Sequence, residues 1–141
     1  MTEAAGAALA ALPPADGWAV AAVRHDALFA PLDPGARIAL LARSAPTHML
    51  VWEAGDDGVD AHLEPFASYS STVADIVLAA DDESLAAVRA AADGALFAAL
   101  RAGIRSGHIV CYMLKRRCLL EERGFDELLD ALGFAFMGAC R

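Results

Sequence analysis

Apolar residues recur at helical spacing from Leu85 to Leu100, and this is the most regular pattern in the chain. The recurring positions are Leu85, Val88, Ala92, Leu96, Ala99 and Leu100. Intervals of three and four place them on one side of a helix, as a buried face requires. Residues 81–84 carry three carboxylates and a serine, which suit the unpaired N–H groups of a first turn. With Gly103 and Gly107 as stop signals, the pattern predicts one helix of roughly 30 Å from Asp81.

A Gly/Asp turn between two β-rich runs predicts an antiparallel hairpin. The first run spans 47–54, the second spans 59–63, and Gly55-Asp56-Asp57-Gly58 separates them. Pro65 then ends the second strand or places it at a sheet edge. Asp56 and Asp57 are interpreted as turn formers and not as an acid/base pair.

The remaining segments are short, and two of them stay ambiguous between helix and strand. Trp18 to Val23 fits a strand or a helical turn, and 37–42 fits a strand or a short helix. The other expected elements are strands over 73–80, 108–114 and 134–137, a loop over 68–72, and short helices over 115–123 and 126–132. Together they predict an α+β fold, in which a mostly antiparallel sheet packs against a long Ala-rich helix and shorter C-terminal helices. An α/β sandwich is the alternative.

Length and composition predict a single domain with apolar surface to spare. The chain has 141 residues, 57% of them hydrophobic, and a mean hydropathy of +0.42, although 34 residues are alanine. We expect residues 1–141 to form one domain, with 1–14 as a mobile helical arm that Pro13-Pro14 stops. Surplus apolar surface on a small domain usually lies in an interface, so a homodimer is expected, with a further protein partner.

The charge pattern excludes some partners and suggests another. A net charge of −8 argues against nucleic-acid binding, which relies on cations that neutralise phosphates. Five cations and no carboxylate lie between Arg101 and Arg117, whereas 56–64 and 81–83 are acidic. This asymmetry fits a basic patch that meets an acidic partner, including a second copy across a two-fold axis. No apolar run reaches the ~18 residues of a membrane span, and the amino terminus lacks the positively charged start of a secretory signal. We therefore expect no membrane partner and a cytoplasmic location.

The chain offers few groups for metal or cofactor chemistry. Three cysteines at unpatterned spacing, Cys111, Cys118 and Cys140, predict free thiols. His108 and Cys111 would point to opposite faces of a strand, and no close pair of cysteines announces a zinc site. We therefore expect no metal site and no cofactor.

Catalytic residues are not predicted either, but one basic cluster is a candidate anion site. Cys118 follows three cations, yet no orienting base is legible, and no serine lies in a G-x-S-x-G elbow. Arg105, His108, Arg116 and Arg117 could bind a phosphate or a carboxylate, although a solvated cationic face is the favoured interpretation.

Two functional hypotheses follow from these observations. The preferred one is a non-enzymatic, homodimerising protein-interaction module, adaptor- or chaperone-like, which offers an apolar groove to a partner. The alternative is a small-ligand-binding or enzymatic domain that recognises an anionic ligand through the basic cluster.

Overall fold

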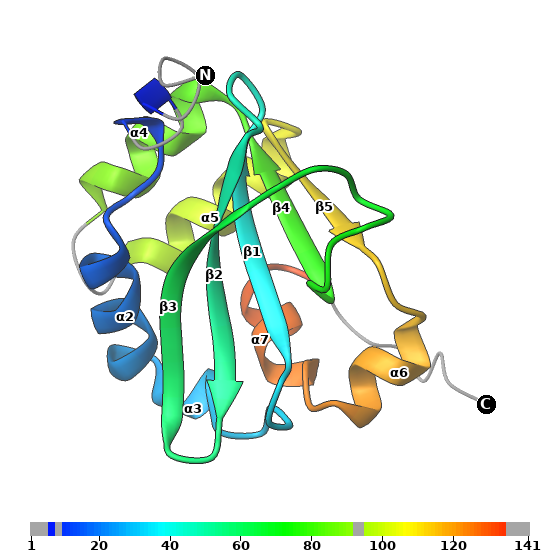
Figure 1. Ribbon diagram of the computed structural model, residues 1–141. Coiled ribbons are helices and arrows are strands. Elements are labelled where there is room, and N and C mark those ends of the chain that lie inside the picture. The colour runs from blue at the N-terminus through cyan, green and yellow to red at the C-terminus, as the bar shows by residue number, and fades with distance from the viewer. Residues whose placement is uncertain (1–5, 8–9, 92–94, 135–141) are drawn as a thin grey trace.

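The computed structural model describes residues 6–7, 10–91 and 95–134, and it has the predicted α+β fold (Figure 1). Five strands form one mixed sheet in the order β3-β2-β1-β4-β5. The strands are β1 Arg37–Ala42, β2 His48–Gly55, β3 Gly58–Pro65, β4 Ile76–Ala80 and β5 Ile109–Met113. The helices are α2 Ala15–Arg24, α3 Asp26–Phe29, α4 Asp82–Ala90, α5 Leu96–Ser106, α6 Arg117–Glu122 and α7 Asp126–Ala131.

The predicted hairpin is confirmed as β2 and β3, which pair in register from Gly55 opposite Gly58 to His48 opposite Pro65. The segment left ambiguous at 37–42 is strand β1, at the centre of the sheet, and 18–23 belongs to helix α2. β1 pairs antiparallel with β2 and parallel with β4, and β4 pairs antiparallel with β5. The sheet is therefore antiparallel except at its β1–β4 junction.

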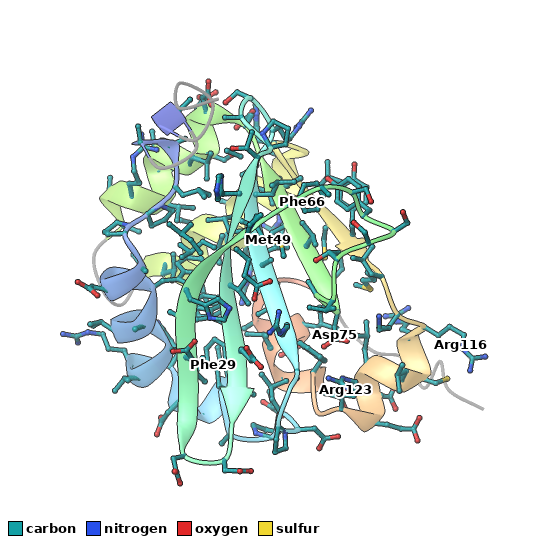
Figure 2. All side chains as sticks on the ribbon, in the orientation of Figure 1. Phe29, Met49, Phe66, Asp75, Arg116 and Arg123 are labelled. Atoms are coloured by element: carbon teal, nitrogen blue, oxygen red, sulfur yellow. The ribbon has the colours of Figure 1, made fainter. Side chains whose placement is uncertain are left out.

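Two layers of side chains bury the two faces of the sheet. The inner face, which the helices cover, presents Ile38, Leu40, Leu50, Trp52, Ile76 and Leu78. The outer face presents Ala39, Leu41, Met49, Val51, Val77 and Ala79. No helix covers this second layer among the described residues. It is covered by the connection between β3 and β4, which crosses in front of the sheet and supplies Phe66 and Tyr69 (Figures 1 and 2).

The long helix predicted from Asp81 is wrong in one respect, because the segment forms two helices. Asp81 caps α4 as expected, accepting a hydrogen bond from the Ser84 N–H at 2.9 Å, but helical backbone ends at Ala90. β5 begins opposite the last residue of β4, since Ala80 pairs with Ile109. The connection must therefore return to the end of the sheet where it started, and a single straight rod of roughly 30 Å would finish too far away. Two helices, α4 and α5, allow the return.

Smaller differences concern the ends of other elements. The strand expected over 73–80 begins only at Ile76, and the strand expected over 134–137 lies mostly outside the described residues. Most of the arm expected at 1–14 also lies outside them, but Leu12 is buried in the core and the Ala11 carbonyl accepts a hydrogen bond from Arg89. Within the described ranges, no helix combines the length and the apolar character needed to cross a membrane.

Candidate functional site

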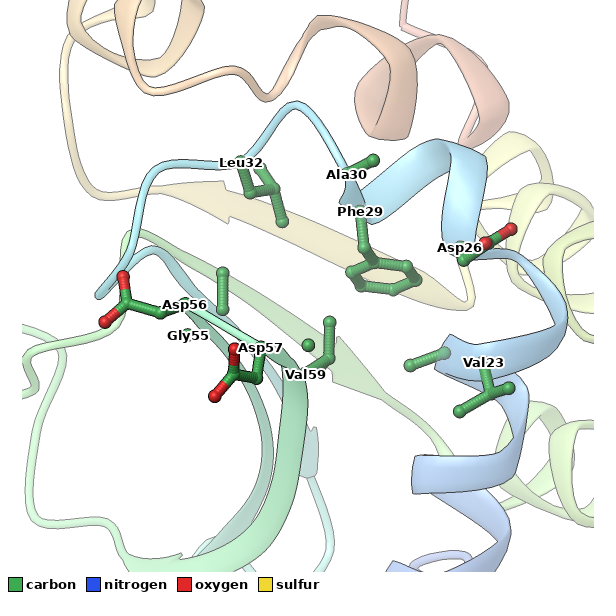
Figure 3. Close-up of a pocket in the computed structure, with 12 residues that line it drawn as sticks. Val23, Asp26, Phe29, Ala30, Leu32, Gly55, Asp56, Asp57 and Val59 are labelled. Carbon is green, nitrogen blue, oxygen red and sulfur yellow. The ribbon is translucent and has the colours of Figure 1, made fainter.

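A pocket of about 470 Å³ lies between the end of α2, helix α3 and the β2–β3 turn (Figure 3). Its volume falls in the range of pockets that bind small molecules. Its lining consists of Ala22, Val23, Asp26, Phe29, Ala30, Leu32, Ala54, Gly55, Asp56, Asp57, Gly58 and Val59. The walls are apolar, and the three carboxylates are exposed to solvent.

Local backbone geometry builds this pocket from segments far apart in the sequence. His25, with φ −111° and ψ 36°, breaks the chain between α2 and the single turn of α3, so the two helices line the pocket at an angle. On the opposite side, Gly58 adopts φ +140°, a conformation that glycine reaches without strain, and turns the chain from β2 into β3. The turn thus faces Phe29 and Val23 across the pocket (Figure 3).

The aromatic residue of the pocket wall is fixed by an aromatic cluster behind it. Phe29 lies edge-on to Trp52, with ring centroids 5.0 Å apart, and Trp52 stacks on Trp18 at 3.8 Å. The Trp52 indole N–H also donates a hydrogen bond of 2.6 Å to the Trp18 carbonyl. Since edge-to-face and stacked rings restrain one another, this wall of the pocket is preformed.

Charge and exposure define what the pocket can accept. Asp26, Asp56 and Asp57 are the ionisable groups among its lining residues, and no cation lies with them. Val23 is 74% exposed and adds apolar surface to the lining of the pocket. The lining contains no histidine, cysteine or hydroxyl group, so it offers no nucleophile paired with a base. The pocket is suited to bind an apolar group that has a positive charge beside it.

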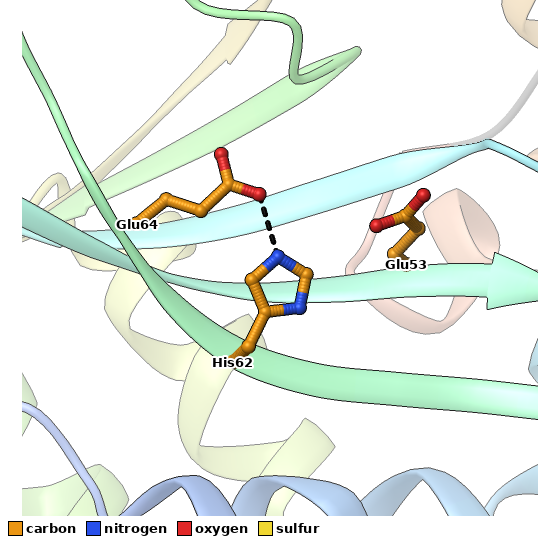
Figure 4. A group of neighbouring side chains, drawn as sticks. All are labelled: Glu53, His62 and Glu64. Carbon is orange, nitrogen blue, oxygen red and sulfur yellow. Dashed lines mark hydrogen bonds and ion pairs between the residues drawn. The ribbon is translucent and has the colours of Figure 1, made fainter.

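A second polar cluster lies on the outer face of the sheet (Figure 4). The Arg37 guanidinium donates hydrogen bonds to Glu64 at 2.6 Å and to Glu53 at 2.9 Å. His62 bridges Glu64 at 2.5 Å and Asp60 at 2.6 Å. Burial lowers the pKa of His62, but its hydrogen bonds to Glu64 and Asp60 outweigh that effect and raise the pKa above its ordinary value.

This cluster could be mistaken for a metal site. Ligand atoms of Glu53, His62 and Glu64 lie within 4.8 Å of one another. However, Arg37 already supplies both glutamates with a cation, at hydrogen-bonding distance. We therefore interpret the cluster as an ionic network that ties β1, β2 and β3 together, and assign it no ligand.

A buried carboxylate extends this network toward the C-terminal helices. Asp75 is 2% exposed and accepts a hydrogen bond of 2.9 Å from the Arg37 backbone N–H. The guanidinium of Arg123 lies 3.3 Å from the same carboxylate oxygen (Figure 2). Asp75, which immediately precedes β4, therefore joins the start of this strand to the segment after α6.

The four residues predicted to bind an anion do not lie together. Arg105 and His108 precede β5, whereas Arg116 and Arg117 follow it. A five-residue strand is about 17 Å long, so the two pairs lie at opposite ends of β5. His108 is hydrogen-bonded to Asp81 at 2.5 Å, and this bond raises the pKa of His108. The pKa of Asp81 is lowered, mainly by the hydrogen bond from the Ser84 N–H and then by the bond to His108. Anion binding by either pair stays a prediction.

The cysteines differ from the three free thiols expected. Cys111 is a free thiol on β5, and burial raises its pKa to about 12, so it is protonated and unreactive at neutral pH. Cys118 is disulfide-bonded, and the expectation is wrong for it, because spacing along the chain does not reveal a pairing made by the fold. Cys140 lies outside the described residues.

Sequence reasoning did not find the pocket. Asp56 and Asp57 were correctly placed in a turn, but nothing in the sequence connects them with Val23 and Phe29, which lie about 30 residues earlier. The one available signal is that α2 carries two large apolar residues, Val20 and Val23, which its buried face does not use.

Comparisons with known proteins add little to this geometry. No protein-family model matches the chain, and no curated protein matches it. One solved structure, described as "UbiJ-SCP2 Ubiquinone synthesis protein", is similar over 79% of this chain and 95% of its own, with a TM-score of 0.37 and 18% sequence identity. A similarity this weak supports no conclusion about function.

Proposed function

We propose that this chain is a non-enzymatic, homodimerising protein-interaction module, adaptor- or chaperone-like, that binds an apolar side chain of a partner in the pocket beside α2. The observation that carries the proposal is the pocket itself: preformed apolar walls, exposed carboxylates and no catalytic pair among its lining residues. The cytoplasmic location expected from the sequence stays a prediction.

The charge at the pocket indicates the kind of partner. Asp26, Asp56 and Asp57 lie beside an apolar cavity and lack a neighbouring cation in its lining. A partner segment with a leucine or phenylalanine next to lysine or arginine would place its apolar group against Phe29 and its cation near these carboxylates. Such exposed charges mainly steer the encounter and select the partner, whereas burial of the apolar group supplies the affinity.

Three fluorescent peptides test the proposal by anisotropy titration of the full chain. They are a lysine-flanked dileucine peptide, its glutamate-flanked counterpart and a lysine-flanked diserine peptide. We expect saturable binding of the first at a dissociation constant on the order of 10–100 µM, and much weaker binding of the other two. Failure of all three peptides to bind by about 1 mM would contradict the proposed pocket function.

Two variants connect binding with this pocket. Ala30→Leu adds side-chain volume at an exposed position in the lining and should abolish binding. Asp57→Asn removes one carboxylate, keeps a residue that turns accept, and should weaken binding of the lysine-flanked peptide several-fold. The matched control Glu122→Gln removes one exposed carboxylate from α6, outside the pocket lining, and should leave binding unchanged.

A further inference from the structure

The two edges of the sheet are protected very differently. β3, at one edge, carries Asp60, His62 and Glu64 and ends at Pro65. β5, at the other edge, reads Ile-Val-Cys-Tyr-Met and has neither a charged residue nor a proline. Charges and proline are the usual devices that keep an exposed edge from pairing with another strand. The edge at β5 lacks them.

The hydrogen bonds of β4 show which backbone groups of β5 point outward. The Asp81 N–H donates to the His108 carbonyl, and the Leu114 N–H donates to the Asp75 carbonyl. Residues of an antiparallel pair alternate between bonded and non-bonded positions, so the even-numbered residues of β5 bond to β4. The N–H and C=O groups of Ile109, Cys111 and Met113 therefore point away from β4. No described strand pairs with them.

From this geometry we infer that β5 is the homodimer interface, where a second copy of this chain pairs antiparallel with β5 across a two-fold axis. The inference rests on the homodimerisation proposed above and names its surface. A two-fold axis through Cys111 sets Cys111 opposite its own copy and Ile109 opposite the partner's Met113. All three outward-pointing residues then lie in bonded pairs, each of which exchanges both N–H···O bonds. Any two-fold register centred on a residue of β5 sets odd-numbered residues opposite odd-numbered ones, but only the register at Cys111 pairs all three within the strand.

Side chains on the outer face favour the same pairing. Val110 and Tyr112 are 37% and 39% exposed. In the register centred on Cys111, Val110 lies opposite the partner's Tyr112 in a non-bonded pair, where side chains approach most closely. The Tyr112 ring is already positioned by Tyr69, with ring centroids 4.3 Å apart. Pairing would therefore cover aromatic and β-branched surface twice.

Charges beyond the strand ends are complementary in this arrangement. Lys115 and Arg116 follow β5, whereas Asp81 binds His108 just before it, and Asp82 and Glu83 come next to Asp81 in the chain. Arg43 lies at the same end, where it donates to the His108 carbonyl. Antiparallel pairing brings Lys115 and Arg116 of one copy toward the carboxylates of 81–83 in the other, and does so twice. Because Asp82, Glu83 and Arg116 are solvent-exposed, their contribution should fall with added salt.

Amide hydrogen exchange of the full chain, followed by NMR together with native mass measurement, tests the interface residue by residue. In a monomer, the amides of Ile109, Cys111 and Met113 should exchange fast while those of Val110 and Tyr112 are protected. In the inferred dimer, all five should be protected. A dimeric sample whose odd-numbered amides exchange fast would overturn this interface but not dimerisation. A monomer at ~100 µM would overturn both.

Two proline variants provide a matched pair. Met113→Pro removes an outward N–H without removing a hydrogen bond to β4, and should raise the dimer dissociation constant at least about tenfold. Leu63→Pro removes an outward N–H from β3 in the same way, since the Phe66 N–H bond to Thr47 assigns the even-numbered residues of β3 to β2. It should leave the dimer unchanged. An equal effect of both variants, each confirmed as folded, would contradict the inference.

Discussion

Gly103→Ala should destabilise this protein, although alanine is the better helix former. Gly103 lies inside α5, where it is buried against β5. A Cβ there would lie 2.4 Å from Ile109 Cδ1 and 2.6 Å from Ile109 Cγ1. Replacing glycine by alanine in a helix gains about 1 kcal/mol of propensity, whereas overpacking a core costs about 1–3 kcal/mol. Because Ile109 is 1% exposed and has little room to move, we take the upper part of the overpacking cost, about 2–3 kcal/mol, and expect a net loss of about 1–2 kcal/mol.

Urea unfolding followed by the fluorescence of the two buried tryptophans measures this change. Gly17→Ala in α2 is the control, because its Cβ would meet nothing closer than Pro14 Cγ at 3.7 Å. The same substitution should therefore stabilise the protein there by about 0.5–1 kcal/mol. The two alanines are expected to change the free energy of unfolding with opposite signs.

A double-mutant cycle identifies the contact responsible. Ile109→Ala removes both clashing atoms and by itself should cost about 2–5 kcal/mol. In that background, Gly103→Ala should become neutral or stabilising, since only the gain in propensity remains. If Gly103→Ala costs the same in both backgrounds, or stabilises the wild type, the steric argument is wrong.

Three further predictions use pH, hydrogen bonding and backbone conformation. The pKa of His62 is raised in the folded state, so its stabilisation is complete below its ordinary pKa of 6.5 and is lost as pH rises above that value. His62→Gln should therefore flatten the loss of stability above pH 6.5, and parallel pH curves for the two proteins would contradict this. Trp52→Phe should cost about 1–2 kcal/mol more than Trp18→Phe in urea unfolding, because Trp52 loses a hydrogen bond whereas the buried Trp18 indole N–H has no acceptor among the described residues. Equal costs would refute this assignment. Gly124→Ala should cost at least ~3 kcal/mol, whereas Gly107→Ala should cost about 1 kcal/mol. Both glycines have positive φ, but only at Gly124 would an added Cβ lie 1.9 Å from a backbone carbonyl, that of Pro31. Similar melting temperatures of the two variants would show that this contact does not matter.

The elements that the sequence predicted correctly are those whose signals are local. Gly55 and Gly58 flank two aspartates in a turn, and the hairpin forms around them with Gly55 opposite Gly58. Asp81 and Ser84 are three residues apart, and their hydrogen bond starts α4 where it was expected. Such signals are complete within a few residues, so no knowledge of the fold is needed to interpret them.

The break between α4 and α5 depends on topology and could not be predicted in this way. Alanine at position 91 does not specify an end, and Asp93-Gly94, which follows in the sequence, weakens a helix without fixing where it stops, because one glycine is tolerated inside a helical pattern. What requires the break is that β5 returns beside β4, with Ile109 opposite Ala80. That information lies in the pairing of two strands and not in the helical segment itself.

The candidate site expected from the sequence and the pocket found in the structure differ for a related geometric reason. Arg105 and Arg116 are close in the sequence, but an intervening strand advances about 3.3 Å per residue and separates them. Val23 and Val59 are far apart in the sequence, yet α2 packs against the sheet beside β3 and brings both to one pocket. Closeness along the chain therefore made the basic residues a candidate site, whereas it gave no sign of the pocket.

The two proposed surfaces can act independently, because they lie at opposite edges of one sheet. The pocket is formed beside β3 at the β2–β3 turn, whereas dimerisation is assigned to β5, with three strands between them. A dimer paired through β5 therefore leaves both pockets open, and a partner with two suitable segments would gain avidity if its linker can span them. It follows that Ala30→Leu should abolish peptide binding without changing the mass of the assembly. Met113→Pro should instead yield a monomer that binds one short peptide as tightly as the wild type does at each site.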